Sequence, residues 1–202
     1  MKEIGVLCMS AVVAISAFSG PSAGLGPSPQ AATLMCAQAA KRALGSAAIV
    51  LRCGDLTGSG ALEVLAVTRI PGLPDRKEGI PVSRLWVGRQ FSVSQWVAQL
   101  ETDDQRFIKN SEGYVGVYFI DDSNLSDGYL LSIDKACTDG SSSLALELRY
   151  VDREGKFDEE SLPLEVCWNA SVRRFQEHDD TDDPEGFHNE VKNPKHFRSK
   201  KP

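Results

Sequence analysis

A strict alternation of side chains over residues 144–151 constrains the fold more than any other feature of this sequence. Leucine or tyrosine occupies every even position from 144 to 150, while Glu147 and Arg149 fall between them. This period of two is typical of a β-strand that packs one face on a core and turns the other toward solvent. A chain organised around such strands is expected to fold as an antiparallel β protein.

Shorter runs of the same kind recur along the chain, and clusters of Gly, Pro, Asn, Asp and Ser separate them. We expect further strands at residues 46–52, 62–70, 82–90, 94–100, 114–120, 128–134, 164–168 and 172–177. About nine short strands at this spacing predict an all-β antiparallel sandwich or barrel.

One segment departs from this pattern and predicts a single N-terminal helix. It reads QAATLMCAQAAKRALG and is rich in Ala, Leu, Lys and Gln, which are strong helix formers. Ser28 can cap the helix and Pro29 suits its first position, while Gly45 can end it. Cys36 and Ala40 fall four residues apart and therefore share a helix face.

The two ends of the chain are expected to lie outside the fold. Residues 1–19 contain an apolar run from Ile4 to Phe18 followed by small residues, which is typical of a secretory signal peptide. An uncleaved anchor is the alternative. Residues 20–30 read as a flexible linker, and residues 178–202 as a charged, partly disordered tail, so the domain spans 31–177. We therefore expect a secreted or periplasmic protein with no stable membrane insertion after signal cleavage.

Cysteine usage agrees with export. Signal cleavage would remove Cys8 and leave an even number of cysteines, which predicts disulfides in an oxidising compartment. Close spacing along the chain favours the pairs Cys36–Cys53 and Cys137–Cys167 among the three connectivities; four buried thiols are the alternative. A zinc site is not expected, because the sequence has no C-x-x-C pair and no His near a Cys.

The stretch CGDLTGSGALEV is a candidate metal loop. Asp55, Thr57, Ser59, Gly60 and Glu63 occupy positions 1, 3, 5, 6 and 9 of a D-x-[DN]-x-[DN]-G pattern, in which side-chain oxygens can converge on a hard cation. The stretch resembles the calcium loops of FG-GAP and VCBS-type repeats, although Thr and Ser replace the expected Asp or Asn ligands. We expect no cofactor, and the resemblance leaves calcium open. The alternative is a turn closed by side-chain hydrogen bonds to the backbone.

A second acidic loop, DDSNLSDG at residues 121–128, offers similar oxygen ligands between two predicted strands; a solvated hairpin loop is the alternative. Catalytic signatures are scarce. All three histidines, at positions 178, 188 and 196, lie in or at the edge of the tail, and neither G-x-S-x-G nor H-E-x-x-H is present. A pair of carboxylates suited to glycoside hydrolysis stays open. Trp86, Trp96 and Trp168 are candidates for a sugar-stacking platform or for the core.

The chain as a whole resembles a group of uncharacterised exported bacterial proteins. The resemblance rests on a short Cys-bearing helix, on GDLTGSGALE, on Ile80–Leu85 and on Trp168–Glu177. The net charge of −6 argues against nucleic acid as a partner. We expect an exported, non-catalytic structural or binding module of the cell envelope, whose specific role and partner the sequence does not identify; a glycan and a protein are both open. The alternative is a carbohydrate-binding or weakly carbohydrate-active protein.

Overall fold

The fold is mainly antiparallel β-sheet with one N-terminal helix, as the alternation predicts. The computed structural model describes residues 27–102, 108–116, 128–134, 137, 144–152, 154–156 and 163–178. In this part of the chain the elements are α1 (Pro29–Leu44), β1 (Ile49–Gly54), β2 (Glu63–Arg69), β3 (Ile80–Gln90), β4 (Trp96–Thr102), β5 (Ile108–Asn110), β6 (Gly113–Gly116), β7 (Gly128–Asp134), β8 (Ala145–Val151), β9 (Leu164–Asn169) and β10 (Arg174–His178).

The sheet forks at its longest strand, β3. One edge of β3 pairs with β2 over nearly its whole length, from Val82 to Arg89. The other edge is shared, because β7 pairs with Ile80–Val82 and β4 pairs with Trp86–Gln90. Strands β8, β9 and β10 extend the arm that begins with β7, while β5 and β6 extend the arm that begins with β4. All of these pairings are antiparallel.

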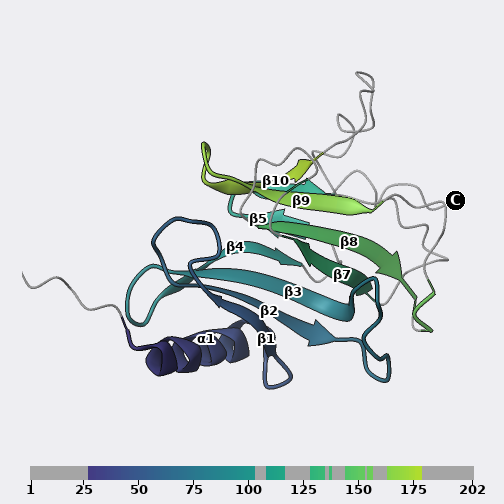
Figure 1. The fold of residues 1–202 in the computed structure, drawn as a ribbon, viewed down its shortest axis with the longest axis horizontal. Helices are drawn as coiled ribbons and strands as arrows, with labels where there is room; N and C mark the ends of the chain where they lie inside the picture. The colour runs from purple at the N-terminus through teal and green to yellow at the C-terminus, as the bar shows by residue number, and fades with distance from the viewer. Residues whose placement is uncertain are drawn as a thin grey trace, which may run out of the picture.

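The two arms fold toward each other (Figure 1), and both contribute buried side chains to the main core, among them Leu100, Ile108, Leu146 and Phe175. β10 contacts β4 and β6, and β6 also contacts β9, although no β-ladder joins the two arms there. Trp168 of β9 and Phe175 of β10 are opposite each other in one arm and meet edge to face in the main core, with ring centroids 5.3 Å apart and both side chains buried. The arrangement is a barrel whose last seam is made by side chains.

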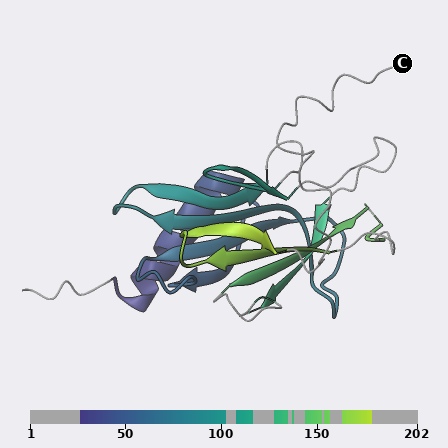
Figure 2. The same ribbon diagram turned by 90° about the horizontal axis from the view of Figure 1, so that it is seen from above.

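A helix covers the opposite face of β1, β2 and β3 and forms a second layer. α1 runs obliquely across these strands (Figure 2). Its buried face carries Cys36, Ala39 and Ala40, which pack with Val64 and Trp86 in a separate apolar cluster. The small alanine side chains let the helix approach the sheet closely, which favours dense packing.

The helix ends lie where the sequence predicts them. The Oγ atom of Ser28 accepts a hydrogen bond from the Ala31 N–H at 3.3 Å, and Pro29 is the first helical residue. Gly45 follows the last turn with φ of 87°, a conformation that glycine adopts readily. The helix therefore begins within the last residues of the predicted linker 20–30. Sheet pairing continues to His178, one residue past the predicted end of the domain.

The structure differs most from the predicted strands at β5 and β6. β5 was not expected, because three residues are too few to show a period of two. The predicted strand at 114–120 corresponds to β6, Gly113–Gly116, which forms a hairpin with β5. Residues 117–120 lie outside the described residues. The predicted signal 1–19 and tail residues 179–202 also lie outside them.

An exposed ion pair after β2 allows a test by titration. Arg69 donates to both carboxylate oxygens of Asp75, and this hydrogen bonding holds the pKa of Asp75 below its ordinary value. A lowered carboxyl pKa contributes stability above the unfolded-state pKa, and the contribution is lost as the pH falls through the folded-state value. We expect an NMR titration to show the low pKa, and Arg69→Gln to return it toward normal. An unchanged pKa in that variant would contradict the assignment.

Candidate functional site

The loop between β1 and β2, residues 55–62, is held by two carboxylates. Asp55 lies at its start, where Oδ1 accepts the Ser59 N–H at 2.8 Å and Oδ2 accepts the Gly60 N–H at 2.9 Å. Gly58 and Gly60 have φ of 72° and 76°, so the tight path of the loop depends on glycine at both positions. Asp55 therefore closes the turn through hydrogen bonds to the backbone, as the alternative to a metal loop expects, whereas the Thr57 hydroxyl donates to the Glu63 carboxylate instead of the backbone.

Glu63 is the centre of this loop although its side chain is fully buried. Its Oε2 accepts the N–H groups of Leu56 and Thr57 at 3.0 and 2.9 Å. Its Oε1 accepts the hydroxyls of Thr57 and Ser59 at 2.8 and 3.1 Å. The Nε atom of Arg89 lies 4.0 Å from the same oxygen, so the buried charge has a partner.

Among the predicted metal ligands, the structure brings Thr57, Ser59 and Glu63 together, while Asp55 binds the backbone of the same loop. The central role of Glu63 could have been inferred from sequence. It lies two residues before Leu65 on the same face of a strand, and a carboxylate on an inward face needs internal donors.

Calcium binding by this loop is a hypothesis that thermal unfolding can test. An ion that binds only the folded state must raise the melting temperature. Because four donors already satisfy the Glu63 carboxylate, we expect the same melting temperature in excess calcium and in excess chelator. A clear rise with calcium that Asp55→Asn abolishes would contradict this expectation.

Two disulfides have the pairing that the sequence favours. Cys36 and Cys53 join α1 to β1 with a Cα–Cα distance of 6.1 Å. Cys137 and Cys167 join the connection between β7 and β8 to β9 with a Cα–Cα distance of 6.0 Å. Two such pairs indicate an oxidising, extracytoplasmic environment.

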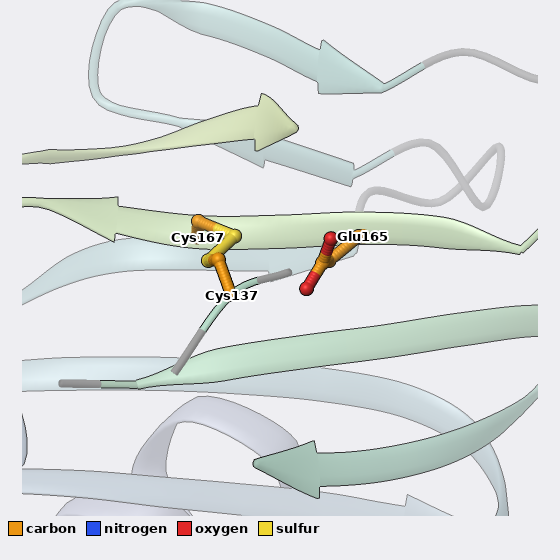
Figure 3. A group of neighbouring side chains, drawn as sticks. All are labelled: Cys137, Glu165 and Cys167. Atoms are coloured by element: carbon orange, nitrogen blue, oxygen red, sulfur yellow. A yellow bond between two sulfur atoms is a disulfide. The ribbon is translucent and has the colours of Figure 1, made fainter. Parts of the chain in front are cut away.

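The second disulfide lies beside a carboxylate (Figure 3). The carboxylate oxygen of Glu165 and the sulfur atoms of Cys137 and Cys167 all lie within 4.8 Å of one another. Glu165 and Cys167 are two residues apart on β9, so both project from the outer face of the sheet, opposite the core. The two cysteines are buried and Glu165 is half-buried.

The same outer face carries further charges around Glu165. In the ladders, Glu165 is directly opposite Glu147 of β8 and His178 of β10. Like charges opposite each other destabilise a sheet, and Arg149 offsets this because its Nε lies 3.1 Å from Glu147 Oε1. This row was not predicted, because it depends on the pairing of three strands.

The seam between the two arms forms a cleft of about 360 Å³. Its walls come from the β5–β6 hairpin and from β10, and we call it the seam cleft. Asn110 Nδ2 donates to the backbone oxygen of Phe175 at 2.8 Å, and Arg174 forms an ion pair with Glu112. The residues that line it are Asn110, Glu112, Val115, Arg174, Phe175, Gln176 and Glu177.

Removing the Asn110 amide tests whether these side chains close the barrel. We expect Asn110→Ala to lower the free energy of unfolding by about 1 kcal/mol, because the Phe175 carbonyl loses its donor. Glu112→Gln should cost less, since exposed ion pairs are worth roughly 0–1 kcal/mol. Urea unfolding at neutral pH measures both, and equal or reversed losses would show that the amide is not the main bond.

The tryptophans do not form an exposed platform. Trp86 is buried under α1 and Trp168 is buried in the main core, while Trp96 is half-buried with its ring centroid 6.3 Å from that of Trp86. The core interpretation is therefore correct for two of the three. His188, His196 and the acidic loop at 121–127 lie outside the described residues. Within the described part, the single helix is too short to cross a membrane.

Comparisons of the chain with protein-family models, with curated proteins and with solved structures find no match. The resemblance to exported bacterial proteins therefore stays a prediction. The features that bear on function are the loop at residues 55–62, the two cysteine pairs and the seam cleft.

Proposed function

We propose that this chain is an exported, non-catalytic structural or binding module of the cell envelope. The observation that carries the proposal is the pair of disulfides, each of which fastens a peripheral segment to the sheet. Disulfides persist in oxidising compartments and stabilise domains that function there. The apolar run at the N-terminus supports export by the same route.

The use of the polar side chains supports a non-catalytic role. Glu63 and Asp55 hold a loop, Asn110 holds the seam, and Arg174 is paired with Glu112. A catalytic carboxylate must be able to exchange a proton with a substrate, whereas Glu63 is fully buried and fully hydrogen-bonded. These groups therefore stabilise the loop and the seam of the fold.

An exposed turn supports binding of a partner. The turn between β3 and β4 is closed by a hydrogen bond from the Phe91 N–H to the Gln95 oxygen at 2.9 Å. It presents Phe91 and Val93 to solvent, with 76% and 87% of their residue surface exposed. Apolar side chains held outward in an ordered turn are suited to contact with a protein partner.

Expression of the full chain in a bacterial host tests the proposal. We expect the mature protein in the periplasm or medium, an N-terminus that has lost the first residues, and four cysteines resistant to alkylation without reductant. A panel of glycoside and ester substrates should show no turnover. Cytoplasmic protein with free thiols would overturn export, and turnover abolished by a carboxylate substitution in the seam cleft would overturn the non-catalytic role.

Glycan binding at the seam cleft is a second candidate. The cleft gathers amide, carboxylate and guanidinium groups, which can hydrogen-bond sugar hydroxyls. Calorimetry with a panel of oligosaccharides tests it. Binding should be lost in Arg174→Ala and kept in Arg84→Ala, whose exposed side chain lies on β3 outside the cleft. Binding that both variants keep would place the glycan elsewhere.

A further inference from the structure

We propose that reduction of the Cys137–Cys167 disulfide creates a binding site for a zinc ion, with Glu165 as the third protein ligand. The site is independent of the proposed function and of the calcium hypothesis. In the oxidised protein the two sulfur atoms are bonded to each other and hold no metal. In the reduced protein they become two thiolate ligands beside a carboxylate.

The distances suit the ion. Cysteine sulfur binds zinc at about 2.3 Å and a carboxylate oxygen at about 2.0–2.2 Å, so tetrahedral ligands lie roughly 3.5–3.8 Å from one another. The three ligand atoms here already lie within 4.8 Å of one another. Breaking the S–S bond lets the sulfur atoms separate toward the zinc spacing while both residues keep their backbone positions.

The backbone holds two of the ligands at a fixed spacing. Glu165 and Cys167 project from the same face of β9, which is paired on both sides by β8 and β10. The cysteines have only 4% and 7% of their surface exposed and pack with Ala145. A partly dry site of this kind favours an ion that is bound by thiolates over its hydrated form.

The electrostatics also favour a cation. Two thiolates and a carboxylate this close repel one another, so the deprotonated dithiol is disfavoured unless a positive charge joins it. The other disulfide provides a contrast, because Cys36 and Cys53 lie in a cluster of alanine, valine and tryptophan side chains. Among the described residues, the group around Glu165 is the one grouping of three metal-ligating side chains.

The chemistry balances with a dithiol as reductant. The reductant gives two electrons and two protons to the disulfide and becomes a disulfide itself, which leaves two protein thiols. Zinc then displaces one proton from each thiol and binds both sulfur atoms and Glu165. Water takes the fourth position. Disulfide and zinc thus exclude each other, and bound zinc should slow reoxidation of this pair.

The full chain carrying Cys8→Ser, Cys36→Ser and Cys53→Ser tests the proposal, because Cys137 and Cys167 are then its only cysteines. After reduction by dithiothreitol and anaerobic removal of the reductant, cobalt should give thiolate charge-transfer absorption, and zinc should displace it at one ion per chain. We expect Glu165→Gln to weaken zinc binding by more than the roughly 10–100-fold that loss of an outer partner costs. The matched control Glu101→Gln, on β4 in the other arm, should leave zinc binding unchanged.

Alkylation of the reduced unsubstituted chain gives a second measurement that needs no variant. Relative to the zinc-free reduced chain, zinc should protect Cys137 and Cys167 from iodoacetamide and leave modification of Cys8, Cys36 and Cys53 unchanged, as peptide mass mapping would show. Absence of thiolate absorption, equal zinc affinity in Glu165→Gln, or an equal effect of zinc on all five cysteines would each overturn the proposal. Zinc binding by the oxidised protein would also overturn it.

Discussion

Glu63→Ala is expected to lower the free energy of unfolding by about 3–5 kcal/mol, the usual cost of removing one partner from a buried charge pair. The substitution leaves the N–H groups of Leu56 and Thr57 and the Thr57 hydroxyl without their acceptor. Hydrogen bonds to a charged group contribute about 1.5–3 kcal/mol each, and unsatisfied buried donors are costly. Arg89 also loses the carboxylate 4.0 Å from its Nε atom.

Glu63→Gln tests the charge of the Glu63 side chain apart from its shape. Asp55→Ala tests the exposed half of the loop. Glu63→Gln keeps the volume but has one acceptor oxygen in place of two, so we expect a smaller loss than for alanine. Asp55→Ala removes two bonds at an exposed site and should cost about 1 kcal/mol. Urea unfolding at neutral pH measures all three. A loss for Glu63→Ala no larger than for Asp55→Ala would show that the buried carboxylate does not anchor the loop.

Local features of the fold were predictable because neighbouring residues determine them. The strand at Gly128–Asp134 has the predicted bounds, and the inward faces of β8 and β9 carry the predicted leucine, valine and tryptophan side chains. The helix caps at Ser28 and Gly45 depend only on the first and last turns. Alternation and capping act within a few residues, so a single sequence contains them.

The fork at β3 could not be predicted, because it depends on which distant strands share one edge. Val82 is opposite Tyr129 of β7, while Trp86, four residues later, is opposite Glu101 of β4. Nothing in the alternation of β3 distinguishes these two partners. The seam is non-local in the same way, since Asn110 and Phe175 are 65 residues apart in the chain.

The cluster around the second disulfide was partly predictable. The spacing of Glu165 and Cys167 places both on one face of a strand, and the pairing with Cys137 follows from sequence proximity. The sequence does not determine on which side of the disulfide the Glu165 carboxylate lies, because that depends on rotamers and packing. A zinc site was not expected because the sequence has no C-x-x-C pair and no His near a Cys. A carboxylate beside a cysteine pair can also serve as a ligand.

Replacement of each cysteine pair by alanine is expected to cost about 3 kcal/mol or more, through the freedom gained by the unfolded chain. The separation of 17 residues between Cys36 and Cys53 predicts a loss of about 3 kcal/mol, and the separation of 30 residues between Cys137 and Cys167 about 3.6 kcal/mol. Denaturant unfolding of both double variants measures these losses.

Hydrogen exchange identifies which segment each staple holds. In Cys36→Ala/Cys53→Ala, we expect faster exchange in α1 than in β7–β9, because α1 then remains on the sheet only through Ala39, Ala40 and their apolar neighbours. Cys137→Ala/Cys167→Ala should leave exchange in α1 unchanged and serves as the matched control. Losses below about 1 kcal/mol for both pairs would contradict the stapling role. Uniform acceleration across the domain in the first variant would instead show that α1 and the barrel unfold as one cooperative unit.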